Sequence, residues 1–173
     1  MLTGTTIKSF DPIVDDDCTK MILGTMPGVA SLDKQEYYGH SDNTFWDIIA
    51  RVFDTTHNED TVENISYKDK ATLLLKNNIA LWDVLQYCDR KGSLDNAIKN
   101  EIKNDFKDFL TQHPKIKTII FNGQKAEKYF DSCFKQLTEL YGLTLKTLPS
   151  TSPSHTLNTF KKLKEWRQVL SAE

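Results

Sequence analysis

Cysteine is scarce in this sequence, and its three cysteines lie far apart: Cys18, Cys88 and Cys133. An iron–sulfur cluster needs several closely spaced cysteine ligands, so this pattern argues against one. An odd number of widely separated cysteines is typical of reduced thiols inside a cell rather than of a disulfide framework. We therefore expect a protein that holds no metal ion and needs no cofactor.

The sequence also lacks an excess of positive charge and any long hydrophobic run. It has 22 Lys and Arg against 24 Asp and Glu, a formal net charge of -2. Proteins that coat nucleic acid are strongly basic, so any phosphate contact has to come from a few local groups. No apolar segment approaches the length of a membrane span, and the N-terminus lacks a basic stretch followed by an apolar one. These absences predict an intracellular, cytoplasmic protein with no membrane partner.

What the sequence does contain is a regular alternation of short apolar runs and amphipathic segments. The 173 residues are enough for one core, and we expect residues 1–173 to form a single domain. The predicted strands are residues 20–24, 79–82, 117–121 and 143–148. The predicted helices are residues 43–53, 67–78, 100–112, 124–140 and 157–170, with irregular segments at residues 55–66 and 85–98.

This alternation is typical of the α/β class. It predicts a three-layer α/β/α sandwich around a central four-stranded parallel sheet. In such sheets, binding sites form beyond the carboxyl ends of the strands. Loops rich in polar side chains leave those ends at residues 24–43, after Asp83, and at residues 149–155. These loops are where we expect the site.

The first of these loops is long for a compact domain, and long ordered loops tend to be functional. Gly24 and Gly28 let the backbone approach a ligand, and Pro27 stiffens the turn between them. Tyr37 and Tyr38 supply rings for stacking. Taken alone, the string GTMPG is more typical of an ordinary turn between a strand and a helix.

Six short motifs in order along the chain give the loop a more specific interpretation. They read GTMPG, YYGH, NTFW, LWDV, FNG and PSTSP, within a stretch from about Gly24 to Trp166. With these motifs the chain resembles the uracil-DNA glycosylase superfamily, and within it the hypoxanthine-DNA glycosylases and the mismatch-specific uracil glycosylases. The resemblance implies an enzyme that flips a damaged base out of DNA and cleaves its glycosidic bond.

One residue of the first motif departs from the family pattern. Many members have a catalytic Asn or Asp where this chain has Met26, and a methionine side chain cannot orient a water molecule. Either the protein has lost that catalysis or another group has taken the role, and the candidate is Asn43, whose amide can hold a water below the sugar C1′. A cap on the following helix is an equally good interpretation of Asn43, and one residue can do both.

The resemblance also implies which residues contact the base. Tyr38 is expected to stack on it, and Asp83 to accept a hydrogen bond from N1–H of hypoxanthine or N3–H of uracil. His40 is expected to donate a proton or contact a phosphate, and Thr25 and Met26 complete the expected base-binding set. The alternatives are a tyrosine packed against the following helix, an aspartate that caps a turn, and a histidine that is merely exposed.

Contacts with the DNA backbone are expected from the Ser-rich loop at residues 149–155. Hydroxyls and backbone amides bind phosphates without adding charge, which suits this composition. Ser150 aligns with the family's phosphate-contacting serine, and Thr151 and Ser152 stand where a wedge would enter the duplex. The expected backbone-contacting residues are Gly28, Ser150, Thr151, Ser152 and Ser154. Taken alone, the loop is an ordinary Ser/Pro turn before a helix.

Several residues in and near this loop bear on the expected substrates and phosphate contacts. Small, polar wedge residues imply substrates whose base pairs are already unstable. Leu148 stands where several uracil-specific relatives have His, and His155 also departs from the family pattern. The last helix carries cationic side chains that either extend a phosphate-facing patch or form a solvated face, namely Lys161, Lys162, Lys164 and Arg167.

The predicted function is a monofunctional DNA glycosylase of base-excision repair, acting on hypoxanthine first and on uracil in mismatches second. Its expected partner is single- or double-stranded DNA with a deaminated base, and it is expected to be a monomer associated with the nucleoid when it acts. Backbone amides after Gly24 are expected to stabilise charge on the departing base. One alternative is a non-catalytic or weakly active nucleic-acid binding module. Another is a hydrolase of free mononucleotides, which would not need the Ser-rich loop.

Overall fold

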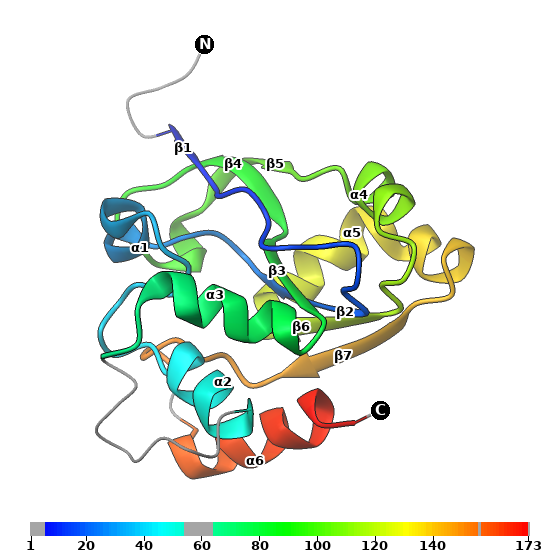
Figure 1. The fold of residues 1–173 in the computed structure, drawn as a ribbon. Helices are drawn as coiled ribbons and strands as arrows, with labels where there is room; N and C mark the ends of the chain where they lie inside the picture. Colours follow the sequence, from blue (N-terminus) through cyan, green and yellow to red (C-terminus); the bar gives the residue numbers. More distant parts are fainter. Residues whose placement is uncertain (1–5, 54–63, 156, 173) are drawn as a thin grey trace.

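The computed structural model describes residues 6–53, 64–155 and 157–172 (Figure 1). Its centre is a parallel sheet of four strands in the order β3-β2-β6-β7. The strands are β2 (Lys20–Gly24), β3 (Ile79–Asp83), β6 (Thr118–Asn122) and β7 (Thr144–Leu148). Each begins and ends within one residue of the strand predicted from the sequence.

Alternate residues of the central strands face opposite sides of the sheet. In β2, Met21 and Leu23 belong to one buried hydrophobic cluster and Ile22 belongs to a second. The same alternation recurs in β6, where Ile119 lies in the first cluster and Ile120 in the second. Strands that are buried on both faces read as continuous apolar runs. That is why these strands were recognisable in the sequence.

Helices cover both faces of this sheet (Figure 1). On the side of Ile22 lie α2 (Phe45–Phe53), α3 (Tyr67–Lys76) and α6 (Thr159–Leu170). On the other side lie α4 (Phe106–Gln112) and α5 (Gln124–Leu140). The predicted three-layer α/β/α sandwich is confirmed. The irregular segment expected at residues 55–66 lies mostly outside the described residues.

A second, antiparallel sheet departs from the sequence prediction. It joins β1 (Thr6–Lys8), β4 (Leu85–Asp89) and β5 (Lys99–Lys103) in the order β1-β4-β5. The prediction of an irregular segment at residues 85–98 and of a helix from residue 100 is therefore wrong in part. Ile102 is 56% exposed and does not extend the apolar face of α4. That helix begins after Asp105, whose side chain accepts a hydrogen bond from the Asp108 amide.

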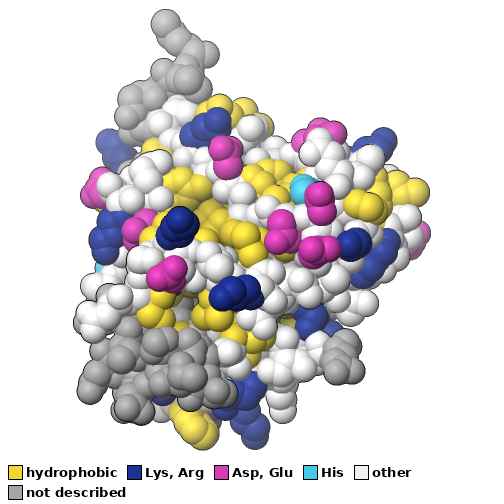
Figure 2. All heavy atoms as spheres, in the orientation of Figure 1, with side chains coloured by type: hydrophobic (Ala, Val, Ile, Leu, Met, Phe, Trp, Pro, Cys, Tyr) yellow, Lys and Arg dark blue, Asp and Glu magenta, His cyan; other side chains and the backbone are white. Residues whose placement is uncertain are grey.

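Two short elements also interrupt segments that were predicted to be loops. They are α1 (Val29–Lys34) and the 3-10 helix η2 (Asp95–Ala97). In the described part of the chain, no helix is both long and apolar enough to cross a membrane. On the face drawn in Figure 2, acidic and basic side chains are interspersed rather than gathered by sign. This mixture matches the formal net charge of -2.

Candidate active site

A cavity of about 600 Å³ opens at the carboxyl ends of the parallel strands. Its walls come from Gly24–Gly28 after β2, Asp83 at the end of β3, Asn122 at the end of β6 and Ser150–Ser154 after β7. β3 and β6 flank β2 on opposite sides, so the winding of the chain reverses beside β2. Ligands of open α/β sheets bind at such a reversal. The cavity therefore lies where the sequence predicted a site.

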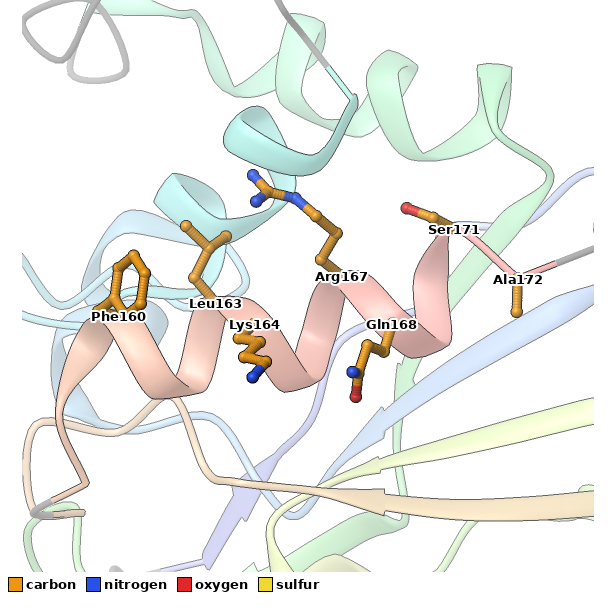
Figure 3. A pocket seen from close by; sticks show the side chains of 7 residues that line it. All are labelled: Phe160, Leu163, Lys164, Arg167, Gln168, Ser171 and Ala172. Carbon is orange, nitrogen blue, oxygen red and sulfur yellow. The ribbon is translucent and has the colours of Figure 1, made fainter.

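A second cavity, of about 380 Å³, lies along α6 (Figure 3). All its lining residues belong to this helix or directly follow it, and they are Phe160, Leu163, Lys164, Arg167, Gln168, Ser171 and Ala172. Leu163 and Arg167 point toward α2, whereas Lys164 and Gln168 point away from it. Among the described residues, no polar group from another element lines this groove, although binding sites usually combine an apolar wall with convergent polar groups. The sheet-edge cavity is the better candidate for an active site.

Asp83 and Tyr38 meet across Gly24 in this cavity. Gly24 pairs with Asp83 in the sheet register. A Cβ atom built on Gly24 would lie 2.5 Å from Asp83 Oδ1 and 2.7 Å from the Tyr38 hydroxyl oxygen. Only glycine therefore allows the backbone to pass between these two polar groups. Asp83 is 3% exposed, and neither its Oδ2 nor the Tyr38 hydroxyl has a hydrogen-bond partner among the described residues.

Burial keeps Asp83 protonated into the neutral range. Removal from water raises the pKa of Asp83 to about 7, and the nearby Asp95 carboxylate adds to the rise while Arg90 opposes it. Asp95 begins η2 and lines the same cavity as Thr25. Burial raises the pKa of Asp95 as well. An unpaired carboxyl that is neutral near pH 7 can both donate and accept hydrogen bonds.

Tyr38 lines the cavity, and its ring packs against Phe45 at the start of α2. Its ring centroid lies 4.1 Å from that of Phe45, with an interplanar angle of 31°. Its backbone is left-handed, with φ 54°, which is uncommon for a bulky residue and can mark a functional constraint. Burial and the Asp83 charge raise the pKa of the Tyr38 hydroxyl, so it stays protonated. The packed and cavity-lining interpretations of Tyr38 are compatible.

Asn43 and His40 also line the cavity, in the segment just before α2. Asn43 is half-buried, lines the cavity, and its Oδ1 accepts a 3.0 Å hydrogen bond from the Phe45 amide. The geometry thus combines a helix-capping contact with access to the cavity. His40 is exposed and its Nδ1 accepts a hydrogen bond from the Asp42 amide. The catalytic role of Asn43 and the contact role of His40 stay predictions.

Thr25 and Met26 form the floor of the cavity, and each is 8% exposed. Met26 also belongs to the hydrophobic cluster beneath the sheet edge. Arg90, which is 5% exposed, holds this turn in place. Its guanidinium donates hydrogen bonds to the carbonyl oxygens of Pro27 and Gly92. The floor is therefore rigid and fixed to the segment that carries η2.

Thr151 ties the second loop to the sheet instead of facing solvent. Its amide donates to Asn122 Oδ1 over 2.9 Å, and Asn122 Nδ2 donates to its hydroxyl over 3.0 Å. The Thr44 amide donates to its carbonyl oxygen over 3.2 Å. Thr151 is only 1% exposed, so the position expected for it, as a wedge or a phosphate contact, does not fit. Its side chain is committed to holding the cavity wall.

The other serines of this loop lie at or near the cavity mouth. Ser150 and Ser152 are half-buried, Ser154 is exposed, and the hydroxyl oxygens of Ser152 and Ser154 are 2.9 Å apart. Gly28 lines the cavity beside the first loop. These positions are compatible with phosphate contacts. Leu148 is 6% exposed within the core, so it cannot replace a base-contacting histidine.

The cationic face expected on α6 is smaller than predicted. Lys162 is 3% exposed, and its Nζ donates to the backbone oxygens of His155 and Ser152. It therefore braces the second loop from within rather than meeting phosphates. Lys161, Lys164 and Arg167 are exposed, and His155 is exposed at the end of the loop.

Three cavity residues, or their supports, were missed by sequence reasoning: Asp95, Asn122 and Arg90. Asn122 directly follows the strand predicted at residues 117–121, so the rule that sites form at carboxyl ends would have found it. Asp95 and Arg90 lie in a segment read as irregular, which gave no position relative to the sheet. Within residues 6–53, 64–155 and 157–172, no group of three or more His, Cys, Asp or Glu side chains is arranged to hold a metal ion.

Comparisons with known proteins agree with this geometry. The family model of the uracil DNA glycosylase superfamily matches residues 12–172. Proteins named hypoxanthine DNA glycosylase from Methanosarcina acetivorans and Methanosarcina barkeri are 32% and 30% identical to this chain over 162 residues, 94% of this chain and 96% of each relative. The solution NMR structure of a candidate uracil DNA glycosylase from Methanosarcina acetivorans is similar, with a TM-score of 0.78 and 32% identity. That match covers 95% of this chain and 96% of the other.

Proposed function

Because the chain belongs to the uracil DNA glycosylase superfamily, we propose that it hydrolyses the N-glycosidic bond of a deaminated base in DNA, with hypoxanthine preferred and mismatched uracil second. The observation that carries this proposal is the buried, unpaired carboxyl of Asp83 at the edge of a cavity of about 600 Å³. A buried polar atom without a partner is costly, and a ligand that supplies the partner recovers that cost.

The Asp83 carboxyl matches the pairing edge of hypoxanthine when it is protonated. Hypoxanthine offers an N1–H donor beside an O6 acceptor. A neutral carboxyl accepts from N1–H with one oxygen and donates to O6 through the other. Uracil offers the same pair at N3–H and O4. This contact therefore does not exclude uracil, which we propose as the second substrate. The raised pKa of Asp83, about 7, keeps this neutral form populated at physiological pH.

The walls of the cavity fit a base that has left the duplex. A flipped base needs an aromatic or apolar surface to replace its stacking neighbours. The Tyr38 ring, supported from behind by Phe45, supplies that surface. Base–aromatic stacking of this kind contributes about 1–3 kcal/mol. Thr25 and Met26 close the floor beneath the base.

Cleavage then requires a water at the sugar and stabilisation of the departing base. Asn43 is the proposed water-holding residue, because its amide lines the cavity while its cap bond to Phe45 fixes its orientation. Backbone amides after Gly24 stabilise charge that develops on the base. None of the described residues that line the cavity is a lysine, so we propose simple hydrolysis without a lyase step.

The residues around the cavity would contact the DNA backbone. Gly28, Ser150, Ser152 and Ser154 surround the cavity mouth and would contact the DNA backbone through amides and hydroxyls. We propose that residues 1–173 act as one monomeric domain on single- or double-stranded DNA, in base-excision repair inside the cell.

A single-turnover assay tests the proposal. Duplexes that hold inosine, uracil, xanthine or a thymine mismatch are incubated with excess protein, and base release is measured beside free inosine monophosphate. We expect release of hypoxanthine from the inosine duplex and none from the free nucleotide. Tight binding to the inosine duplex without release would support a binding module instead. Release from the free nucleotide at a similar rate would support a nucleotide hydrolase.

A further inference from the structure

An exposed leucine lies among the residues that line the cavity, on a different segment from the Ser-rich loop. Leu94 is 65% exposed and lines the cavity, directly before Asp95, which is half-buried within it. Exposed large apolar side chains are unremarkable when scattered singly. An exposed leucine next to a binding cavity differs, because whatever enters the cavity has to pass it.

The backbone that carries Leu94 is held by several hydrogen bonds. The Ser93 hydroxyl accepts a 2.9 Å hydrogen bond from the Val29 amide, and the Arg90 guanidinium binds the carbonyl oxygens of Gly92 and Pro27. The Leu94 carbonyl accepts from the Ala97 amide over 3.0 Å, which closes the turn of η2. The segment is thus fixed to the cavity floor. Because the backbone is already fixed, insertion of the Leu94 side chain into a base stack would not require the segment itself to lose conformational freedom.

The Ser-rich loop, residues 149–155, offers few apolar side chains that could compete with Leu94 for this role. Thr151 is buried, and Ser152 and Ser154 are small and polar. Pro153 is the one apolar side chain that the Ser-rich loop adds to the cavity lining within the described residues. It lies in a turn closed by a 3.0 Å hydrogen bond from the His155 amide to the Ser152 carbonyl. Pro153 is therefore the rival that an experiment has to separate from Leu94.

We propose that Leu94 is the wedge residue that enters the DNA base stack and fills the space left by the flipped base. The inference rests on the proposed glycosylase function. Apolar side chains that insert between base steps stabilise the unstacked state and offset the cost of flipping. Leu94 and Asp95 would then act as neighbours, one holding the gap open in the duplex and the other lining the pocket that receives the base.

Comparison of duplex with single-stranded substrate isolates this role, because only a duplex has a stack to fill. Leu94→Ala is expected to lower the single-turnover rate on an inosine:cytosine duplex by about tenfold, while the rate on single-stranded inosine DNA changes less than about twofold. Leu140→Ala is the matched control, because Leu140 is 68% exposed at the end of α5 and is absent from the cavity lining. Leu94→Phe is expected to retain most of the duplex rate.

A flipping measurement separates this inference from the proposed function. A 2-aminopurine placed beside inosine brightens when its neighbour leaves the stack, whether or not a bond is cleaved. Leu94→Ala is expected to reduce that signal, and Leu140→Ala to leave it unchanged. An inactive wild-type protein that still produced the signal would contradict glycosylase activity but not the wedge. Equal losses on both substrates, no loss of signal, or a loss produced by Pro153→Ala instead would overturn the role of Leu94.

Discussion

Gly24 decides how close the two unpaired polar groups of the cavity can come. Its missing side chain lets the Asp83 carboxyl and the Tyr38 hydroxyl approach the same point of the backbone. The carboxyl is buried there without a compensating partner, which keeps it protonated further up the pH scale than an exposed aspartate. Its protonation state is therefore linked both to base recognition and to stability.

Activity should depend on pH through Asp83. Above the pKa of about 7, the ionised carboxyl only accepts hydrogen bonds and repels O6 of hypoxanthine, so the wild-type rate on inosine DNA should fall. Asp83→Asn keeps a donor and an acceptor at all pH values. Its single-turnover rate should stay within about tenfold of the wild-type rate near pH 6 and lose the alkaline decline. Rates measured from pH 5.5 to 9 check this, and identical profiles for the two proteins would rule it out.

The free energy of unfolding should also depend on pH through Asp83. Because the folded-state pKa is raised from 3.8 to about 7, the folded protein holds a proton between these values that the unfolded chain has released. Rising pH therefore favours unfolding in this window, and stability is lost as pH passes from about 4 to about 7. Between pH 5 and pH 8, wild type should lose roughly 2–3 kcal/mol more unfolding free energy than Asp83→Asn. Urea unfolding at both pH values measures the difference, and parallel losses would refute the linkage.

The residues of the base pocket were predicted from motifs, not from physical reasoning about single residues. Asp83 and Tyr38 were each also compatible with an ordinary structural role. What the sequence could not supply was their mutual position across Gly24, because that depends on the sheet register. The sequence could not place Asp95 near Asp83 either, because their proximity depends on a turn that no local pattern indicates.

At the scale of elements, a comparison of the residues that cap α2 and α3 can distinguish a capping role of Asn43 from a catalytic one. Asn43→Ala removes the bond to the Phe45 amide, and Ser66→Ala removes the equivalent bond at the start of α3, from the Asp69 amide to the Ser66 hydroxyl. Each should destabilise the fold by about 1 kcal/mol. Only Asn43→Ala should slow base release, by at least about a hundredfold. Thermal unfolding and single-turnover rates test both, and an unchanged rate in Asn43→Ala would eliminate it as the water-holding residue.

The second loop should depend on Thr151 for its attachment to β6. Thr151→Val removes the hydroxyl that accepts from Asn122 Nδ2 and leaves that buried donor unpaired. We expect a loss of about 1–3 kcal/mol in unfolding free energy. The control Thr111→Val removes an exposed hydroxyl that bonds only within and beside α4, and should cost less than about 0.5 kcal/mol. Equal losses in the two variants would show that the Thr151 hydroxyl does not hold the loop.

The elements that the sequence predicted well are those buried on both faces. β2 and β6 read as apolar runs because helices cover them on either side, and α5 showed a long apolar face. β5 was misread because the sequence KNEIK is largely exposed and has no apolar alternation to mark a strand. An edge strand of this kind is specified by pairing with β4, which is information that lies elsewhere in the chain.

For the whole molecule, the near balance of charge limits how strongly salt can affect DNA binding. With a net charge of -2 and mostly hydroxyls at the cavity mouth, few phosphates can be neutralised. Each neutralised phosphate contributes about -0.9 to the slope of log binding constant against log salt. We expect a slope no steeper than about -3.

The exposed lysines of α6 can be tested within the same titration. If they meet phosphates, Lys161→Gln or Lys164→Gln should each reduce the slope by about 1, whereas the exposed Lys76→Gln on α3 serves as a control. Fluorescence anisotropy between 50 and 300 mM salt, about the range in which such contacts weaken, measures the slope. A slope steeper than about -6 would show a broad cationic surface that this structure does not present.

The walls of the cavity come from the ends of four strands that are spread over most of the chain, from Gly24 to Ser154. During synthesis, the first loop leaves the ribosome long before the Ser-rich loop that completes the wall. A chain that ends before β7 therefore lacks the wall that Ser150–Ser154 supply. On the proposed function, such an incomplete chain could not enclose a flipped base, so the activity would arise only once the last strand and its loop have been made.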